Sequence, residues 1–213
     1  MIYRIDKNLL DLGGGIYTGV VAAFGVNNAV VNEKIAAILQ EEVAKAVDTL
    51  SGGSVKNEPM LAFYQKAMKS ININPSKYPC SIEAILNRIS KKGEFPSLCP
   101  AVDLGNYISI KYRVPVGVHD VDTLQGELVV RKANEDDCII EENSLEKDPL
   151  TQGEPVYVTG NSVRTRRWMW RQMPAGRVDE GTSNFIFLID GFNDNKETVD
   201  KACTEMMRAA RRF

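Results

Sequence analysis

The chain has 213 residues, of which 44% are hydrophobic and 25% are charged, and its net charge is −2 with a sequence pI of about 5.6. This composition is typical of a globular domain that buries its own core, and it excludes intrinsic disorder. The acidic balance disfavours a protein that coats nucleic acid by electrostatic attraction alone, because such proteins are basic overall.

The N-terminal region predicts two strands and then a helix. β-Branched and aromatic residues in 2–5 and 16–26 predict strands, and the three glycines at 13–15 predict a tight turn between them. The glycines lack the lysine and the serine or threonine that end a P-loop, so we expect no phosphate-binding loop there. Apolar residues at three- and four-residue steps predict a helix that begins after Asn32, whose side chain can cap it, and ends near Ser51.

Helices continue through the middle of the chain and strands follow them. The same apolar spacing predicts helices over residues 59–70, 82–89 and 101–113, although the last segment also fits a strand. Short β-branched runs separated by Asp, Asn, Gly and Pro then predict strands over 116–118, 127–131, 138–141, 155–159 and 185–190. The pattern therefore predicts one compact unit over 1–213 of mixed α+β class.

The second half of the chain contains an acidic section among its strands, and a helix follows the last strand. We interpret the acidic section, residues 135–148, as a solvated loop, because it lacks the spacing of a calcium loop. A helix is predicted from about Asn195, with Val199, Cys203, Met206 and Ala210 on its buried side. Asp194 and Glu197 have the spacing of a capping box.

Several classes of site and location are disfavoured by residue usage. The four cysteines are scattered and the chain has one histidine, so we expect no metal site. Scattered thiols are typical of a reducing compartment, and residues 1–10 lack the apolar core of a signal peptide. The most apolar stretch, residues 16–31, is too short to cross a bilayer. We therefore expect a cytoplasmic protein without a membrane partner.

The strongest local signal is the segment 164–172, Arg-Thr-Arg-Arg-Trp-Met-Trp-Arg-Gln. Five arginines lie between residues 164 and 177, no acid lies between 160 and 178, and both tryptophans of the chain fall here. Arginine binds phosphate with two parallel hydrogen bonds, and tryptophan offers a face on which a base can stack. If the segment is extended, its arginines at 167 and 171 share one side and its tryptophans the other. Alternatively, the tryptophans belong to the core and the arginines pair with the acidic section.

His119 and Asp190 are the candidate catalytic residues. His119 is the one side chain whose ordinary pKa lies near neutrality, and Asp120 and Asp122 lie close enough in sequence to orient it. Asp190 ends an apolar strand, where a carboxylate is costly unless it is paired. It is either a hydrogen-bond anchor for the next turn or a site residue.

Several short motifs in the middle of the chain follow one another in the order of a known family. The matched positions are Val102, Asp103, Asn106 and Tyr107; Pro115 and Asp120; Val130, Arg131 and Ala133; residues 153–157; Arg166, Arg167, Trp168, Trp170, Arg171 and Gln172; and Thr182 and Asn184. Over about residues 74–192 the chain resembles the freestanding form of the B3/B4 editing domain of the phenylalanyl-tRNA synthetase beta subunit.

The resemblance implies a fold and an activity. The fold is a β-barrel-like, mostly antiparallel core over about 74–192 with flanking helices, an N-terminal extension over 1–73 and a C-terminal helix over about 194–213. In the synthetase, this domain binds the aminoacylated 3′ end of tRNA and hydrolyses tyrosine wrongly attached to phenylalanine tRNA. Nothing resembles the ATP-using catalytic domain, so we expect no aminoacylation.

The chain departs from the family at two positions. The family histidine falls at Gly117 and the family glutamate at Leu188, whereas the nearest such residues are His119 and Asp190. A shift of two residues along a strand keeps a side chain on the same face. We therefore expect His119 and Asp190 to share the family pocket at slightly different heights and to select a different amino acid.

These observations predict a stand-alone aminoacyl-tRNA deacylase that acts in trans without a cofactor, with RNA rather than DNA as its partner. His119 would position and deprotonate water, and Asp190 or Gln172 would read the amino group. The expected RNA-binding residues are Asn106, Arg166, Arg167, Trp168, Trp170, Arg171, Gln172 and Thr182, with the arginines on phosphates and a tryptophan on the terminal base. The alternatives are a non-catalytic module that binds tRNA or an amino-acid-like ligand, and a protein interface formed by the arginine–tryptophan segment.

Overall fold

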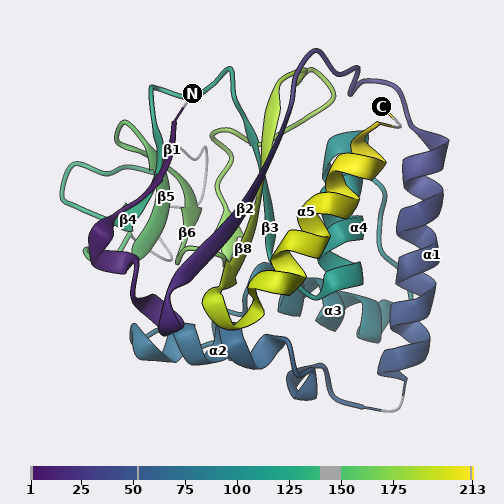
Figure 1. The fold of residues 1–213 in the computed structure, drawn as a ribbon, viewed down its shortest axis with the longest axis horizontal. Helices are drawn as coiled ribbons and strands as arrows, with labels where there is room; N and C mark the ends of the chain where they lie inside the picture. The colour runs from purple at the N-terminus through teal and green to yellow at the C-terminus, as the bar shows by residue number, and fades with distance from the viewer. Residues whose placement is uncertain (1, 52, 140–149, 212) are drawn as a thin grey trace.

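Two β-sheets and five α-helices make up the part of the chain that the computed structural model describes, residues 2–51, 53–139, 150–211 and 213. The first sheet has the strand order β1-β4-β5-β6-β7, and the second has the order β2-β8-β3. In Figure 1 the first sheet lies on one side of the second, and most of the helices lie on the other side.

The five-stranded sheet is antiparallel except where β1 pairs in parallel with β4. Its strands are β1 (Tyr3–Ile5), β4 (Leu128–Lys132), β5 (Pro155–Thr159), β6 (Ser162–Arg166) and β7 (Arg171–Gln172). Every residue of β5 and β6 is buried, so these strands are covered on both faces.

The three-stranded sheet is built around β8 (Phe185–Phe192), which pairs antiparallel with β2 (Ile16–Ala23) on one side and β3 (Val116–Asp120) on the other. The apolar run at the start of β8 suits a strand that is covered on both faces, and all eight of its residues are buried. β8 therefore places whatever polar group it carries deep inside the molecule.

The helices are α1 (Glu33–Leu50), α2 (Leu61–Ser70), α3 (Ser81–Lys92), α4 (Pro100–Tyr112) and α5 (Lys196–Ala210). α4 and α5 cover the face of the β2-β8-β3 sheet that points away from the other sheet, and α1 packs outside α4 (Figure 1). Gly19 permits the close approach of α5, because a Cβ at that position would lie 2.2 Å from the Sγ of Cys203.

The helices predicted from apolar spacing are confirmed, and 101–113 is a helix. Asn32 caps α1 by accepting a hydrogen bond from the Ile35 N–H at 3.2 Å. The predicted capping box at the start of α5 is wrong, because Asn195 instead accepts a hydrogen bond from the Phe192 N–H at 2.7 Å.

The α+β class is confirmed, but the expected barrel-like core is wrong. The described residues form two open sheets, and no strand pairs one sheet with the other. The two strands expected around glycines 13–15 also separate, since β1 joins one sheet and β2 the other. Residues before 73 thus contribute a strand to each sheet. Of the expected strand at 138–141, Cys138 makes a bridge to Ser162, whereas residues 140–149, with most of the acidic section, lie outside the described residues.

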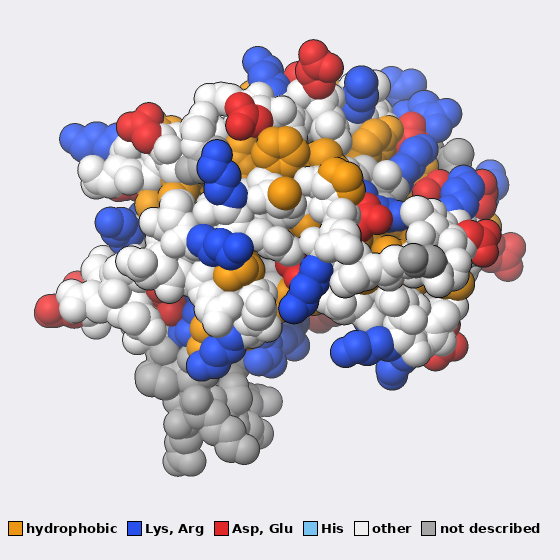
Figure 2. Space-filling model, turned by 90° about the horizontal axis from the view of Figure 1, so that it is seen from below, with side chains coloured by type: hydrophobic (Ala, Val, Ile, Leu, Met, Phe, Trp, Pro, Cys, Tyr) orange, Lys and Arg blue, Asp and Glu red, His pale blue; other side chains and the backbone are white. Residues whose placement is uncertain are grey.

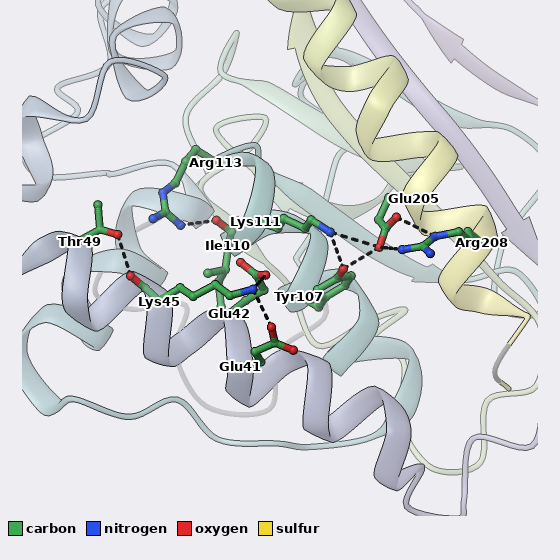
Figure 3. Close-up of polar contacts among 10 residues, drawn as sticks. All are labelled: Glu41, Glu42, Lys45, Thr49, Tyr107, Ile110, Lys111, Arg113, Glu205 and Arg208. Carbon is green, nitrogen blue, oxygen red and sulfur yellow. Dashed lines mark hydrogen bonds and ion pairs between the residues drawn. The ribbon is translucent and has the colours of Figure 1, made fainter.

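A charged cluster joins α4 to α5 at the surface (Figure 3). Glu205 accepts hydrogen bonds from the Tyr107 hydroxyl at 2.7 Å and from Arg208 at 2.8 Å, and it pairs with Lys111 at 3.3 Å. The hydrogen bond from Arg208 is the main cause that lowers the pKa of Glu205 to about 2. Figure 3 also shows Glu41, whose pair with Lys45 lies within α1 alone.

Replacing Glu205 by glutamine should lower the free energy of unfolding at pH 7 by about 1 kcal/mol, a value typical of a solvent-screened network. Because the pKa is lowered in the folded state, this stabilisation is complete above the unfolded value of about 4.3 and is lost as the pH falls towards 2. Urea denaturation at pH 7 and pH 3 checks both points. Glu41→Gln is the matched control and should cost less, and an equal loss in both variants would contradict the bridging role of Glu205.

Candidate functional site

A cavity of about 120 Å³ lies between the two sheets. Asp190 from β8 and Gly117 from β3 line one side, and Tyr157 from β5 and Trp168 from the β6–β7 turn line the other. An apolar cavity of about 150 Å³ accommodates a benzene ring, so the space fits a group the size of an amino-acid side chain.

Asp190 is the polar centre of this cavity. The Tyr157 hydroxyl and the Trp168 indole both donate hydrogen bonds to its Oδ1, the latter at 3.2 Å. Burial raises the pKa of Asp190 to about 7, and these hydrogen bonds oppose the rise. Near neutral pH the carboxyl group is therefore divided between its neutral and ionised forms, which suits it to take up or release a proton.

The backbone at Asp190 is fixed from the helical side. The Tyr64 hydroxyl donates a hydrogen bond to the Asp190 carbonyl oxygen at 2.9 Å, and the Asn195 amide donates to that hydroxyl at 3.0 Å. All three residues are buried, so these hydrogen bonds fix the backbone at the end of β8. Asp190 therefore anchors the end of β8 through its backbone and lines the cavity with its side chain, so both roles expected for it are compatible.

His119 lies directly behind the cavity wall. It is fully buried, and neither ring nitrogen has a hydrogen-bond partner among the described residues. A Cβ at Gly117 would lie 3.1 Å from its Nε2, so the imidazole borders Gly117, the position expected for the family histidine. Its ring centroid is 5.4 Å from that of Tyr157, which also contacts Asp190. Burial, and then the charge of Arg164, lower the pKa of His119 to about 3, so the ring is neutral.

The arginine–tryptophan segment is a hairpin rather than a continuous extended strand. Arg166 pairs with Arg171 across β6 and β7, and residues 167–170 form the turn. Arg167 and Trp168 have φ angles of 48° and 58°, in the left-handed region that side chains other than glycine seldom adopt. The predicted alternation of arginine and tryptophan faces is therefore wrong.

Most of the segment is interior. Arg166 donates two hydrogen bonds to Glu154, at 2.8 and 2.9 Å, and the two side chains are only 4% and 5% exposed. Arg167 lies 3.7 Å from the same carboxylate, and Trp168 packs edge-on against Phe192. The alternative of core tryptophan and paired arginine holds for these three residues, although Glu154 rather than the acidic section supplies the charge.

Trp170, Arg171 and Gln172 are the members of the segment that are not fully buried. Arg171 is exposed and lines the cavity, and Trp170 is half-buried in edge contact with Tyr78, at 4.9 Å between ring centroids. The Arg167 guanidinium lies 3.8 Å from the Tyr78 ring centroid and 4.7 Å from that of Trp170. Trp170 therefore contributes an aromatic wall to the cavity, with Tyr78 and Arg167 packed against it.

A second cavity, of about 340 Å³, adjoins the first. The two share Val116 and Gln172 as walls, and the Gln172 amide bridges the sheets by donating a hydrogen bond to the Val118 carbonyl oxygen at 2.6 Å. Asn106 and the exposed Arg177 are polar groups on the otherwise largely apolar lining of the second cavity.

Thr182 lies apart from the two cavities. Thr182 lines neither cavity, and its hydroxyl accepts a hydrogen bond from the Asp179 N–H at 3.2 Å, which closes a loop.

Within the described ranges, no three His, Cys, Asp or Glu side chains are grouped closely enough to hold a metal ion. In the same ranges, no helix has the length and apolar character needed to cross a membrane.

The surface is not uniformly acidic. Seen from the α2 side, basic side chains are spread over the middle of the face, with acidic ones mostly nearer its edges (Figure 2). A chain of net negative charge therefore still presents local positive surface.

Sequence reasoning missed Tyr157, Tyr78 and Arg177. A buried Asp190 signals that some donor must pair with it. Tyr157, however, lies 33 residues away, and only the packing of one sheet on the other brings them together.

The family model described as the B3/4 domain matches residues 64–211. The chain is also similar to the solved structure of an N-terminal fragment of the phenylalanyl-tRNA synthetase beta subunit from Pyrococcus horikoshii, with 12% identity and a TM-score of 0.48. That similarity covers 99% of this chain and 48% of the other, so the chain spans about half the length of the solved fragment. No curated protein matches the chain.

Asp190→Asn should change how stability depends on pH. Because burial raises the pKa of Asp190, the contribution of this group to stability is fully present below the unfolded value of about 3.9 and is lost as the pH rises through about 7. Asparagine keeps an acceptor oxygen for Tyr157 and Trp168 but does not titrate. Between pH 5 and pH 8, denaturation should therefore show a smaller loss for the variant than for the wild type, and equal losses would show that Asp190 has an ordinary pKa.

Glu154→Gln should destabilise the fold by about 3 kcal/mol, because it removes the carboxylate charge that pairs with the buried guanidinium of Arg166. This loss should persist at high salt, since the pair is shielded from solvent ions. Arg171→Gln is the exposed control from the same hairpin, and its effect should stay within about 0.5 kcal/mol. A similar small effect of Glu154→Gln in thermal and urea unfolding would argue against the buried pair.

Proposed function

This chain belongs to the B3/4 domain family, and from that membership we propose that it hydrolyses the ester bond of a mischarged aminoacyl-tRNA in trans. The observation that carries the proposal is Asp190, a carboxyl group with a pKa near neutrality on the wall of a cavity of amino-acid size. Ester hydrolysis consumes water alone, so the reaction calls for no cofactor.

Asp190 is the proposed recognition group for the amino group of the substrate. An ammonium ion that enters the cavity favours the ionised carboxylate, because an opposite charge at short range offsets the cost of burial. Tyr157 and Trp168 hold the carboxylate in place, and their rings supply apolar walls for the rest of the amino acid. The size of the remaining space then limits which side chains fit.

His119 is the proposed group that orients water. A pKa near 3 makes its imidazole a weak base, so we assign it hydrogen bonding to the water rather than full proton removal. Gly117 lines the cavity and carries no side chain, and a Cβ there would lie 3.1 Å from Nε2, so the imidazole stands next to the cavity wall. The water oxygen forms a bond to the ester carbonyl carbon, the bond to the ribose oxygen breaks, and the ribose oxygen gains the proton that the water loses. Positioning supplies most of the acceleration in this scheme.

The second cavity is the proposed place for the nucleotide half of the ester. The two cavities share Val116 and Gln172 as walls, so the two halves of one substrate would lie on either side of these residues. Arg177 and Arg171 are exposed cations beside the two cavities, where they can bind phosphates, and Trp170 offers a partly open ring for stacking. Arg166, Arg167 and Trp168 are left out of this contact set because they are buried.

A binding module without hydrolysis is the second candidate. It is favoured by Gly117 and Leu188, which replace the family histidine and glutamate, and by the low basicity of His119. Such a module would keep the amino-group site at Asp190 and the RNA contacts while lacking turnover.

Deacylation distinguishes the two candidates. The protein is mixed with a panel of correctly and wrongly charged tRNAs, beside Asp190→Asn and His119→Gln variants whose folding is checked by circular dichroism. Removing the charge of Asp190 should lower the rate for the one released amino acid by about 100-fold or more, because a buried ion pair with the substrate is lost. Tyr17→Phe is the control, since that hydroxyl bonds the exposed Asp200 instead. No release across the complete panel, with tRNA still bound, would leave the binding module.

RNA binding should depend on salt through the exposed arginines. Arg171→Gln and Arg177→Gln should each weaken tRNA binding and reduce the slope of log K against log salt by about 0.7 to 0.9, the value for one phosphate contact. Fluorescence anisotropy at several salt concentrations measures the slope. Lys45→Gln, on the outer helix α1, should leave the slope unchanged, and an unchanged slope in the arginine variants would contradict the placement of the nucleotide half.

A further inference from the structure

The two N-terminal strands reach the site although they precede the region that the family model matches, residues 64–211. β2 is a neighbour of β8, and in their register Thr18 lies directly opposite Asp190. Residues directly opposite in an antiparallel pair point to the same face of the sheet. The Thr18 side chain therefore stands beside the Asp190 carboxyl group.

A hydrogen bond between two hydroxyl groups connects Thr18 to the edge strand of the other sheet. The Tyr3 hydroxyl, from the edge strand β1, donates a hydrogen bond to the Thr18 Oγ1 at 3.1 Å. That bond uses the Tyr3 proton and leaves the Thr18 proton available for Asp190, which lies directly opposite, and the Thr18 hydroxyl opposes the rise of the Asp190 pKa. The Tyr3 ring also stacks on Tyr157 at 6.3 Å between centroids, and Tyr157 donates to the same carboxyl group.

We propose that Thr18 and Tyr3 are positioning residues of the site, which orient the Asp190 carboxylate towards the cavity and stabilise its ionised form. The N-terminal strands are then a working part of the pocket rather than an addition to the matched domain. The effect on hydrolysis rests on the proposed function, whereas the effect on Asp190 itself does not.

The surroundings of Asp190 make this assignment specific. The titratable groups that face it are Tyr3 from β1, Tyr157 from β5 and Tyr64 from α2, with Cys80 next to Tyr64. No ion pair among the described residues includes Asp190. Arg171 lines the same cavity without forming an ion pair with Asp190, so hydrogen-bond donors are the main source of stabilisation of its ionised form.

The test measures the titration of Asp190 by NMR, from the pH dependence of its side-chain carboxyl carbon, with Asp190→Asn to assign the signal. Thr18→Val keeps the shape and β-branching of the residue but removes the donor, so the midpoint should rise by about one pH unit. Thr18→Ser restores a hydroxyl and should return the midpoint to near the wild-type value. Tyr3→Phe should give a smaller rise, because it acts through Thr18.

Tyr17→Phe is the matched control, since it removes a tyrosine hydroxyl from the same strand β2 without touching Asp190, and its midpoint should not move. An unchanged midpoint in Thr18→Val, an equal shift in Thr18→Ser, or an Asp190 that does not titrate between pH 4 and 9 would overturn the proposal. If the shift occurs without deacylation by any variant, the positioning role stands and the hydrolase function fails. If deacylation occurs and its pH profile follows the NMR midpoint in each variant, both stand.

Discussion

The burial of one carboxyl group, that of Asp190, constrains the rest of this structure. A carboxylate on a strand covered on both faces is costly unless donors meet it. Tyr157 from the facing sheet and Trp168 from a strained turn supply those donors, while Tyr64 from α2 binds the backbone beside it. Each of these contacts fixes one element against β8. The contacts that hold the two sheets together are thus the same ones that shape the cavity.

A second buried charge explains why an arginine-rich segment is largely absent from the surface. Glu154 neutralises Arg166 and lies close to Arg167, and this pairing stabilises a turn whose residues adopt left-handed backbone angles. The turn carries Trp168 inward to Asp190. The local density of arginine therefore overstates how much positive charge faces a ligand, and Arg171 and Arg177 are the basic groups beside the cavities.

The departures from the family pattern have a common geometrical basis. His119 lies two residues beyond Gly117, the position expected for the family histidine, and Asp190 lies two residues beyond Leu188, the position expected for the family glutamate. A shift of two residues preserves the face of a strand. The structure places the imidazole against the vacant side of Gly117 and the carboxyl group on the wall of the same cavity. Gly117, beside His119, and Asp190 thus line one cavity from the neighbouring strands β3 and β8.

The sequence by itself determined the family, the α+β class and the helices. Apolar periodicity and the order of motifs are patterns among residues close in sequence, so they can be recognised without the structure. It also singled out His119 and Asp190 through their chemistry. Only the tertiary structure decided that the sheets stay open, that Arg166 and Trp168 are interior, and that Tyr3 and Thr18 join the site. These facts depend on contacts between residues far apart in sequence, such as Tyr157 with Asp190 or Thr18 with Asp190. No local pattern encodes such contacts, since they follow from how one sheet packs on the other.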